Sequence, residues 1–427
     1  MFKTIVNAFK DKEIRKKILI TIALLLVYRL GCWLPVPGIN VQAFSASVDG
    51  QDFLSLLSSV SGGALANGAI LALGISPYIS ASIIIQLLTI AIPSLERLSK
   101  MGDEGKKRIS LYTKIAALVL AIVQAVAIVV SYSSALNTLT MPKWVVGAMV
   151  VTILVAGSMF TYWLGEKITS YGIGNGQSLL IFVGILSTAA SSLYFVIVNI
   201  TKGSTESIWE LLLFTLALVF IFAFIVFMDL GERRIPVQYA KQVKGRKMYG
   251  GQSTFIPIRV NSTGVMPIIF ASSIITFPQL LFSIFWPNSG FYRWYSNWLG
   301  AGGWIYIILT GLLILFFAYF WTQITFNTED ISRNIQQNGG FILGIRPGKP
   351  TAEYLKKISN RITLFGAIFL AIIAIVPNII FKSLSFTGGL TNAFSATGLL
   401  IVVSVAVELD KALDSQMLMK NYKGFLK

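Results

Sequence analysis

The 427-residue chain contains no histidine, only one cysteine (Cys32) and few charged residues, which make up 12% of the total. A single thiol excludes an intramolecular disulfide, and a chain without histidine lacks the side chains typical of a transition-metal site. The apolar segments also lack a Ser/His/Asp set, a Cys/His pair and paired carboxylates. We therefore expect no enzyme, no cofactor and no metal site, and an intramembrane enzyme is the weakest functional class considered.

Carboxylates are equally scarce inside the long apolar segments. Asp229, Glu408 and Asp410 are predicted to lie at helix ends, where water is near. Ion-coupled carriers usually bury carboxylates at mid-membrane, because charge is their cargo or their means of coupling. This scarcity disfavours a small-solute or lipid-linked carrier, which remains the alternative function.

Hydrophobic residues, in contrast, make up 55% of the chain, and the mean hydropathy is +0.73. Soluble domains carry about 25% charged residues, so this composition predicts an all-α polytopic membrane protein. Ten apolar segments are each long enough for a hydrocarbon core that takes about 20 helical residues. The predicted spans are 18–37, 68–92, 113–136, 143–163, 176–199, 208–228, 263–286, 303–325, 361–381 and 394–409. The semi-apolar stretch Phe53–Gly68 is too short and too rich in Ser and Gly to cross, and we expect it to dip back into the protein.

The distribution of basic residues predicts the orientation. With the N-terminus in the cytosol, 30 of the 35 Lys and Arg residues fall in cytoplasmic segments and four fall outside. Arg29, near the outer end of the first span, completes the count. By the positive-inside rule, an even number of spans with both termini in the cytoplasm is expected.

Two of the cytoplasmic loops, 229–261 and 327–361, are both long and strongly basic. Contact with anionic lipids explains the charge of short loops but not the length of these two. Ribosomal RNA could be met there, but no nucleic-acid-binding module is visible and no DNA partner is expected. We interpret the two loops as docking surfaces for a large cytosolic partner, with Arg246, Lys247 and Arg346 as the main contact candidates.

Two glycine-rich motifs superficially suggest nucleotide binding. Residues 172–176 read GIGNG, but the spacing is wrong and no strand precedes them, so we predict a tight turn in which Asn175 caps the fifth span. Residues 344–350 read GIRPGKP, in which Pro350 stands where a magnesium-binding Ser or Thr is required. We predict a rigid turn that presents Arg346, and no ATPase.

A weak internal repeat relates the second and seventh spans. Residues 76–84 (SPYISASII) and 266–275 (MPIIFASSII) both place a proline near the start, followed by Ala-Ser and paired isoleucines. If the chain consists of two halves of five spans, the odd number forces them into opposite orientations, with the functional site between them. The prolines are expected to disturb the helices, while polar Gln86, Asn261 and Ser273 form either ordinary interhelical hydrogen bonds or a seam that can open.

At these residues the chain resembles the SecY family, the pore subunits of the bacterial protein-export channel. The resemblance runs nearly end to end. The matching motifs are 35–39 (PVPGI), 61–65 (SGGAL), 72–75 (ALGI) through 85–88 (IQLL), 172–176 (GIGNG), 233–236 (RRIP), 238–241 (QYAK), 344–348 (GIRPG) and 421–425 (NYKGF).

The resemblance implies a fold and a set of functional residues. The fold is two inverted five-helix halves, 1–200 and 201–427, around an hourglass pore. The implied aliphatic ring at the waist is Ile75, Ile79, Ile181, Ile185, Ile269 and Ile401. The implied plug is a short helix within 53–67, including Phe53, Leu56, Leu57, Gly62, Gly63 and Leu65. The implied lateral gate lies between spans two and three and spans seven and eight, at or near Ser80, Gln86, Asn261, Ser273 and Phe277.

The function implied is a gated conduit in the bacterial plasma membrane for unfolded preproteins. Signal sequences and transmembrane segments open it and leave sideways into the lipid. The partners implied are a SecE-like and a SecG-like small membrane subunit, and a SecA motor ATPase or a ribosome on the basic loops. An uncharged ring suits this task, because a hydrophobic constriction tends to dewet and blocks ions without binding any sequence.

Overall fold

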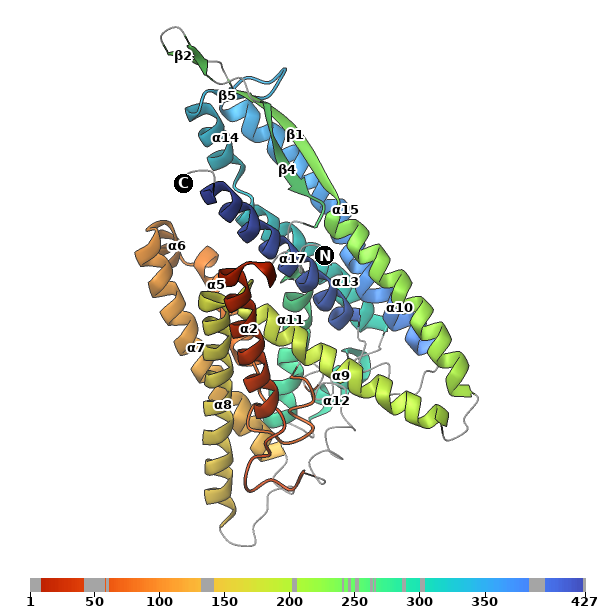
Figure 1. Ribbon diagram of the computed structural model, residues 1–427. Coiled ribbons are helices and arrows are strands. Elements are labelled where there is room, and N and C mark those ends of the chain that lie inside the picture. Colours follow the sequence, from red (N-terminus) through yellow and green to blue (C-terminus); the bar gives the residue numbers. More distant parts are fainter. Residues whose placement is uncertain are drawn as a thin grey trace.

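The computed structural model describes residues 9–41, 58, 61–131, 142–201, 206–239, 242–244, 247–249, 253–261, 264, 266–285, 289–299, 304–383 and 396–424. Helices dominate these residues, and each of the ten predicted spans overlaps one helix (Figure 1). Those helices are α2 (Lys12–Gly31), α5 (Ser76–Ala91), α7 (Asp103–Ser131), α8 (Lys143–Tyr171), α9 (Gly176–Thr201), α10 (Glu206–Leu230), α11 (Met266–Phe285), α13 (Trp304–Thr325), α15 (Lys349–Ser383) and α17 (Ala396–Gly424). Shorter helices are α6 (Pro93–Lys100), α12 (Gly290–Leu299) and α14 (Thr328–Gln337).

Length and hydropathy identify the membrane-spanning helices among the described residues. Five helices pass as candidate spans (α7, α8, α9, α13 and α15), and a sixth is formed by α5 with α6 if that pair counts as one. The pair bends by 105° at Ile92–Pro93. The structure thus describes a mostly helical membrane protein, and the number ten remains a prediction.

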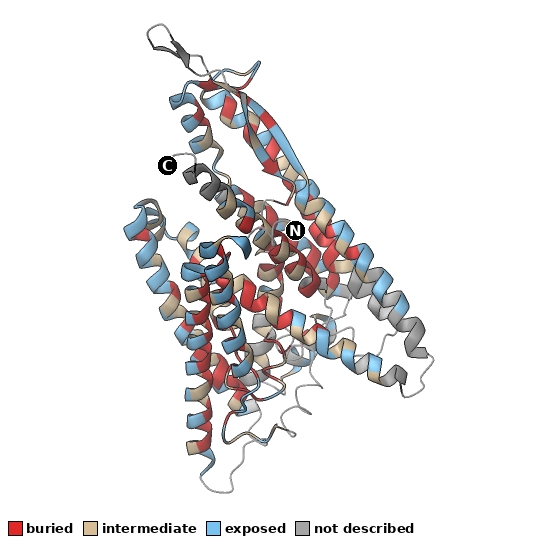
Figure 2. Ribbon diagram, in the orientation of Figure 1, coloured by how far each residue is buried: buried red, intermediate tan, exposed pale blue. Residues whose placement is uncertain are grey.

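The helices present apolar side chains outward as well as inward. Phe227 of α10 is 73% exposed and Phe316 of α13 is 61% exposed. Figure 2 shows exposed residues along the outer faces of the helices and buried residues toward the centre of the molecule. Large apolar residues on the outer surface are what a lipid environment requires, because hydrocarbon surrounds these faces instead of water.

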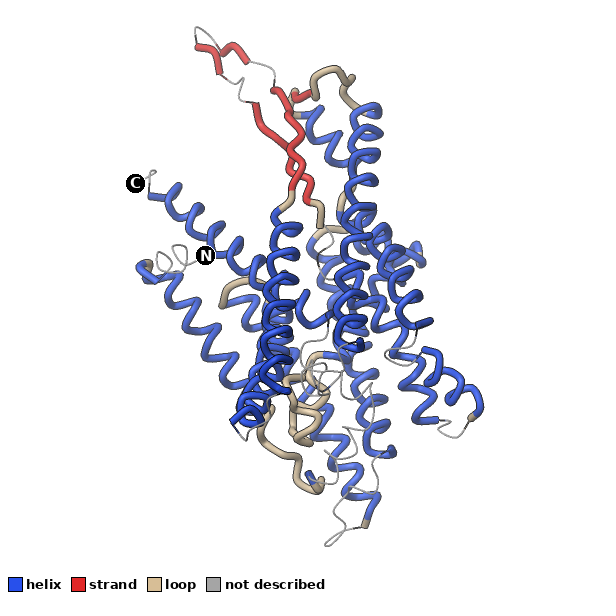
Figure 3. Tube along the Cα trace, turned by 90° about the vertical axis from the view of Figure 1, so that its right-hand side faces the viewer, coloured by secondary structure: helices blue, strands red, loops and turns tan. Residues whose placement is uncertain are grey.

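At one end of the molecule the long loops fold into a unit that the all-α prediction missed. Strands β1 (Glu232–Tyr239) and β4 (Ser253–Arg259) form an antiparallel hairpin, and β5 (Gly340–Phe341) of the other loop pairs with β1. A further pair, β2 (Gln242–Lys244) with β3 (Lys247–Tyr249), extends beyond them (Figure 3). The two loops share one hydrophobic cluster, in which Val237 is 1% exposed and Leu355 is fully buried.

The second of these segments, 327–361, is less of a loop than the sequence suggested. Asn327 caps α14, since its side-chain oxygen accepts hydrogen bonds from the backbone N–H groups of Glu329 and Asp330. Helix α15 begins at Lys349, twelve residues before the predicted ninth span. Hydropathy marks where the membrane begins, but a helix continues beyond it as long as its other face packs against the sheet.

The start of the second span was also placed wrongly. Residues 61–75 form a series of turns, and α5 begins only at Ser76. Gly68 and Gly74 have φ values of 55° and 54°, a left-handed conformation that interrupts a helix and suits glycine. The expected helix disturbance by proline is likewise wrong, because Pro77 and Pro267 are each the second residue of their helix, where no intrahelical hydrogen bond is lost.

Candidate functional site: the aliphatic ring and its surroundings

A tight turn sets the start of α9 and thus the positions of two ring candidates. Gly174 has a φ of 73°, and the side-chain oxygen of Asn175 accepts a hydrogen bond from the backbone N–H of Gln177 at 3.0 Å. The predicted turn and cap at residues 172–176 are therefore confirmed. Ile181 and Ile185 follow four residues apart and share one face of α9.

The structure brings all six ring candidates into a single hydrophobic cluster. Four of them are 3–7% exposed and two are half-buried. The buried residues are Ile75, Ile181, Ile185 and Ile401, and the half-buried ones are Ile79 and Ile269. They come from α9, α11, α17 and the start of α5. Ile75 lies just before α5 rather than within it, but its carbonyl accepts the backbone N–H of Ile79 at 3.1 Å, which continues the helical pattern.

A cavity of about 360 Å³ lies directly against this ring. Ile181, Ile269 and Ile401 form part of its wall. Apolar Met266, Val405 and Val407 also line it, together with polar residues in or next to α9, α10, α17 and the β hairpin: Asn175, Ser178, Asp229, Arg259, Asn261, Ser404, Glu408 and Lys411. This cavity, called the vestibule below, therefore combines an aliphatic wall with polar and charged side chains.

Asn261 follows β4 at the base of the β hairpin and does not lie between α5 and α11, where the sequence analysis expected it. Its side-chain N–H donates to Asp229 Oδ1 at 2.7 Å, across the base of the hairpin. Lys411 Nζ donates to the backbone carbonyl of Asp229 at 3.4 Å, and burial is the main cause that lowers the pKa of this lysine. Among the described residues, Asn261 Oδ1 and Ser404 Oγ have no hydrogen-bond partner. Within the described part of the chain, two buried polar atoms beside this cavity are therefore unsatisfied.

The plug candidates divide into described and undescribed residues. Phe53, Leu56 and Leu57 lie outside the residues that the structure describes. Gly62, Gly63 and Leu65 belong to the turns after position 60, so this part of the expected plug is not a helix. Leu65 is fully buried in a cluster with Val36 and Leu154, which agrees with a stretch that lies inside the protein.

The two helix pairs of the expected lateral gate are present. Helix α5 packs on α7, α11 packs on α13, and α7 contacts α11 where the pairs meet. Gln86 of α5 donates to Ser82 Oγ at 3.3 Å, and its carbonyl oxygen has no partner among the described residues. Ser80 and Ser273 are half-buried on α5 and α11. The side chain of Phe277 lies outside what the structure describes.

Two of the three loop candidates, Lys247 and Arg346, belong to the described part of the sheet unit. Arg346 is exposed in the turn between β5 and α15, where Gly344 and Gly348 both have positive φ values. Its carbonyl accepts a hydrogen bond from the Thr351 hydroxyl at 2.8 Å, which fixes the turn. Lys247 begins β3, and Arg246 lies outside the described residues.

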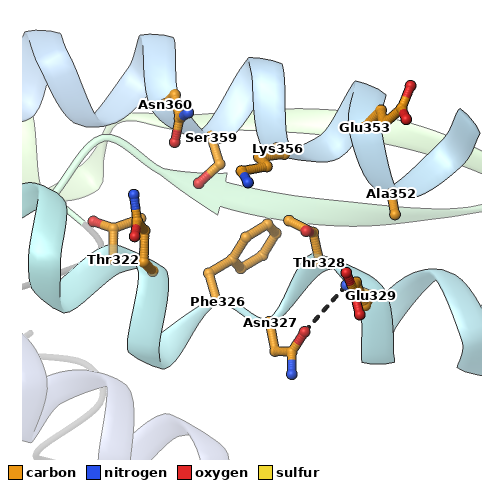
Figure 4. Close-up of a pocket in the computed structure, with 11 residues that line it drawn as sticks. Thr322, Phe326, Asn327, Thr328, Glu329, Ala352, Glu353, Lys356, Ser359 and Asn360 are labelled. Atoms are coloured by element: carbon orange, nitrogen blue, oxygen red, sulfur yellow. Dashed lines mark hydrogen bonds between the residues drawn. The ribbon is translucent and has the colours of Figure 1, made fainter. Parts of the chain in front are cut away.

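A second cavity, of about 440 Å³, lies between α13, α14 and α15 (Figure 4). Phe326 points into it, and exposed Asn327, Glu329, Glu353 and Lys356 surround it. Because these surrounding residues are exposed, the cavity is a groove at the surface of the protein.

Sequence reasoning missed the role of Arg29, which it only counted among the basic residues. Arg29 Nη1 donates to the carbonyl of Gly62 at 3.1 Å, and Nη2 bonds the Ser187 hydroxyl of α9. The available signal was its position: an arginine within an otherwise apolar run is rare and needs a buried polar partner.

Comparison with known proteins agrees with this geometry. The SecY family model matches residues 69–409. The protein translocase subunit SecY of Streptomyces galbus is 41% identical, and the alignment covers 100% of both chains. A solved protein-conducting channel has a TM-score of 0.69 at 21% identity, covering 94% of this chain and 92% of the other. Sec61, in a canine ribosome-channel complex from the endoplasmic reticulum, has a TM-score of 0.64 at 19% identity, covering 94% and 92%.

Proposed function

The chain belongs to the SecY family, and from this premise we propose that it is the protein-conducting channel of a bacterial plasma membrane. It passes unfolded polypeptides across the membrane and releases transmembrane segments sideways into the bilayer. The relatives that support this role are named translocase subunits, and the chains of similar fold are protein-conducting channels.

The observation that carries the mechanism is the joining of six aliphatic side chains from four different elements into one cluster. Because none of them is charged, the constriction repels water and ions while it is closed. Because they are aliphatic, they contact a passing chain without holding it by hydrogen bonds or ion pairs. The adjacent vestibule, with polar atoms such as Asn261 Oδ1, receives the hydrated polypeptide before it reaches the ring.

The proposed architecture has ten spans in two inverted halves, 1–200 and 201–427, with both termini in the cytoplasm. The similar starts of α5 and α11, each with proline second, support equivalent positions in the two halves. The side chains 53–67 form the plug, and the seam of α5 and α7 with α11 and α13 is the lateral gate. A signal sequence opens this seam because its apolar side chains replace the helix contacts there.

The sheet unit is the proposed docking site for the source of driving force. A SecA-type motor or a ribosome binds the basic tips, and SecE-like and SecG-like subunits cover part of the apolar surface. The fold of a channel seen in a ribosome complex supports the ribosome, and the length and charge of segments 229–261 and 327–361 support both partners.

A small-solute or lipid-linked carrier is the weaker proposal. Such a carrier needs a polar pocket enclosed at mid-membrane. The groove beside Phe326 lies at the surface against α14. The 360 Å³ vestibule contains polar residues, but Ile181, Ile269 and Ile401 form one wall of it, and a small polar solute gains no hydrogen bond from that wall. Neither cavity favours the carrier.

Crosslinking at the ring tests the function. A photoreactive amino acid at Ile79 or Ile269 is expected to capture a secretory polypeptide stalled during export, because both side chains pack against the cluster that we propose as the ring. Ile308 of α13, which is 61% exposed on the outer surface, is the matched control and should capture lipid instead. Capture of a small solute at the ring, with no polypeptide, would favour the carrier and contradict the channel.

A further inference from the structure

The last turn of α2 holds the backbone of the plug candidate segment by its carbonyl groups. Besides the bond from Arg29 to Gly62, the Tyr28 hydroxyl donates to the carbonyl of Ser61 at 3.4 Å. The Cys32 thiol donates to the same carbonyl at 3.7 Å. Three side chains of one helix end therefore converge on two consecutive peptide groups.

Gly62 is enclosed on its other side by α9. A Cβ atom at this position would overlap the Arg29 guanidinium and would lie 3.0 Å from the Cα of Gly184. Its φ of 71° also suits glycine alone. The peptide at Gly62 is thus seated between the arginine and the backbone of α9, with no room for a side chain.

Helix α9 connects this seat with the aliphatic ring. Gly184 and Ser187, which contact Gly62 and Arg29, alternate along the helix with the ring candidates Ile181 and Ile185. Since residues three and four apart lie on the same side of a helix, seat and ring occupy neighbouring stripes of one element. Any movement of α9 that widens the ring also moves Ser187, one of the two partners of the arginine, and Gly184, which encloses Gly62 on its other side.

A charged arginine among the apolar residues of α2 is expected to lower the stability of the protein, and such residues in membrane spans usually have a function. It lies in an apolar helix, and its described partners, a carbonyl and a hydroxyl, are neutral. The negative end of the helix dipole compensates the charge only in part. Charged donors form stronger hydrogen bonds than neutral ones, and these bonds depend on fork geometry. The arginine thus attaches the segment through a charge-assisted hydrogen bond whose strength depends on the position of the guanidinium.

We infer that Arg29 is a latch: a positioning residue that holds segment 61–67 on α9 and sets how readily the channel opens. The inference rests on the proposed function. In the latched state Gly62 is fixed between α2 and α9. When a client displaces α9, the guanidinium loses Ser187, Gly62 loses the wall formed by Gly184, and the segment is released from its seat.

The lone thiol provides a native reporter of this release. Cys32 is fully buried and bonded to Ser61, so a maleimide reaches it only when the segment leaves. Arg29→Gln is expected to raise the rate of Cys32 labelling in the full chain in lipid vesicles about tenfold or more, since two charge-assisted bonds are lost. Resting ion permeability should rise with it. Arg29→Lys keeps the charge but cannot donate from two nitrogens to two partners. Its Cys32 labelling rate should lie between the rates of the parent protein and of Arg29→Gln.

Two controls separate a latch from general loosening. Arg15→Gln removes an exposed arginine of the same helix and should change neither readout. Ala189→Cys, in a chain with Cys32→Ala, places a thiol in a buried cluster elsewhere on α9, and Arg29→Gln should leave its labelling rate unchanged. A Cys32 rate within twofold of the parent, or an equal acceleration at position 189, overturns the latch. If Ile79 and Ile269 capture no polypeptide, the proposed channel function is contradicted. This outcome is measured separately from Cys32 labelling, so failure of the function and failure of the latch can be told apart.

Discussion

Gly62 and Gly63 are consecutive residues with the same left-handed backbone, and only the first is enclosed. Their φ values are 71° and 82°. An added Cβ at Gly62 would meet Arg29 and Gly184, whereas one at Gly63 would have nothing within 4 Å. The pair therefore separates the cost of the backbone conformation from the cost of the close approach.

We predict that Gly62→Ala weakens the seat of the segment far more than Gly63→Ala. Both substitutions carry a backbone penalty of about 1 kcal/mol, but only the first must push α9 away. Cys32 labelling should accelerate several-fold more in Gly62→Ala than in Gly63→Ala. Equal acceleration in the two variants would show that the contact with Gly184 is unimportant.

At the residue scale, the sequence predicted features that depend on neighbouring residues, but it did not predict contacts between residues far apart in the chain. Asn175 was identified as a helix cap because capping depends on the next three residues alone. The bond from Arg29 to Gly62 joins residues 33 apart, and no local pattern encodes it. The six isoleucines of the ring came from a family resemblance, since each is indistinguishable by itself from a lipid-facing isoleucine.

At the element scale, hydropathy predicted segments that each overlap a helix, but it missed the strands of the two long loops. Strand β1 alternates buried Ile235 and Val237 with exposed neighbours, which is the pattern of a half-buried strand. The high charge of segment 229–261 favoured its interpretation as a loop, and the alternation that indicates a strand was missed. Pairing of β1 with β5 joins Tyr239 to Gly340, and that register depends on the folded partner, not on local sequence.

We predict that charge reversal at the tips of this unit weakens motor binding and spares its fold. Arg246→Glu, Lys247→Glu and Arg346→Glu together should raise the Kd for a SecA-type motor about 10- to 100-fold at low salt, since exposed ion pairs contribute about 0.2–1 kcal/mol each and the reversed charges repel. The difference should shrink as salt screens the charges. Binding to vesicles that contain the full chain, measured over a salt series, provides the readout.

The matched control for this triple variant changes the same charge elsewhere. Lys106, Lys107 and Arg108 are exposed at the start of α7 and are predicted to face the same side of the membrane. Their reversal to Glu should leave motor affinity within about twofold, a difference of roughly 0.4 kcal/mol. An equal loss in both triple variants would mean that total charge, not the sheet unit, attracts the motor.

At the scale of the whole molecule, the ring cluster joins distant parts of the chain. Ile181 of α9 packs in the same cluster as Ile269 of α11 and Ile401 of α17. In the proposed architecture these residues belong to different halves, so the proposed seal requires both halves to be packed together. On that proposal, a client that separates the halves opens the pore.

We therefore predict that polar substitution in either half breaks the same seal. Ile181→Asn and Ile401→Asn should each increase resting ion flux across the membrane of reconstituted vesicles about tenfold or more. The amide side chain binds water in the proposed constriction, and a constriction that holds water no longer blocks ions. Each is also expected to lower stability by about 1–3 kcal/mol, the cost of a buried polar group without a partner. Ile115→Asn, on the outer surface of α7 at 54% exposure, controls for polarity placed anywhere in a span. If Ile115→Asn leaks as much as the ring variants, or if the ring variants stay tight, the barrier does not lie at these six side chains.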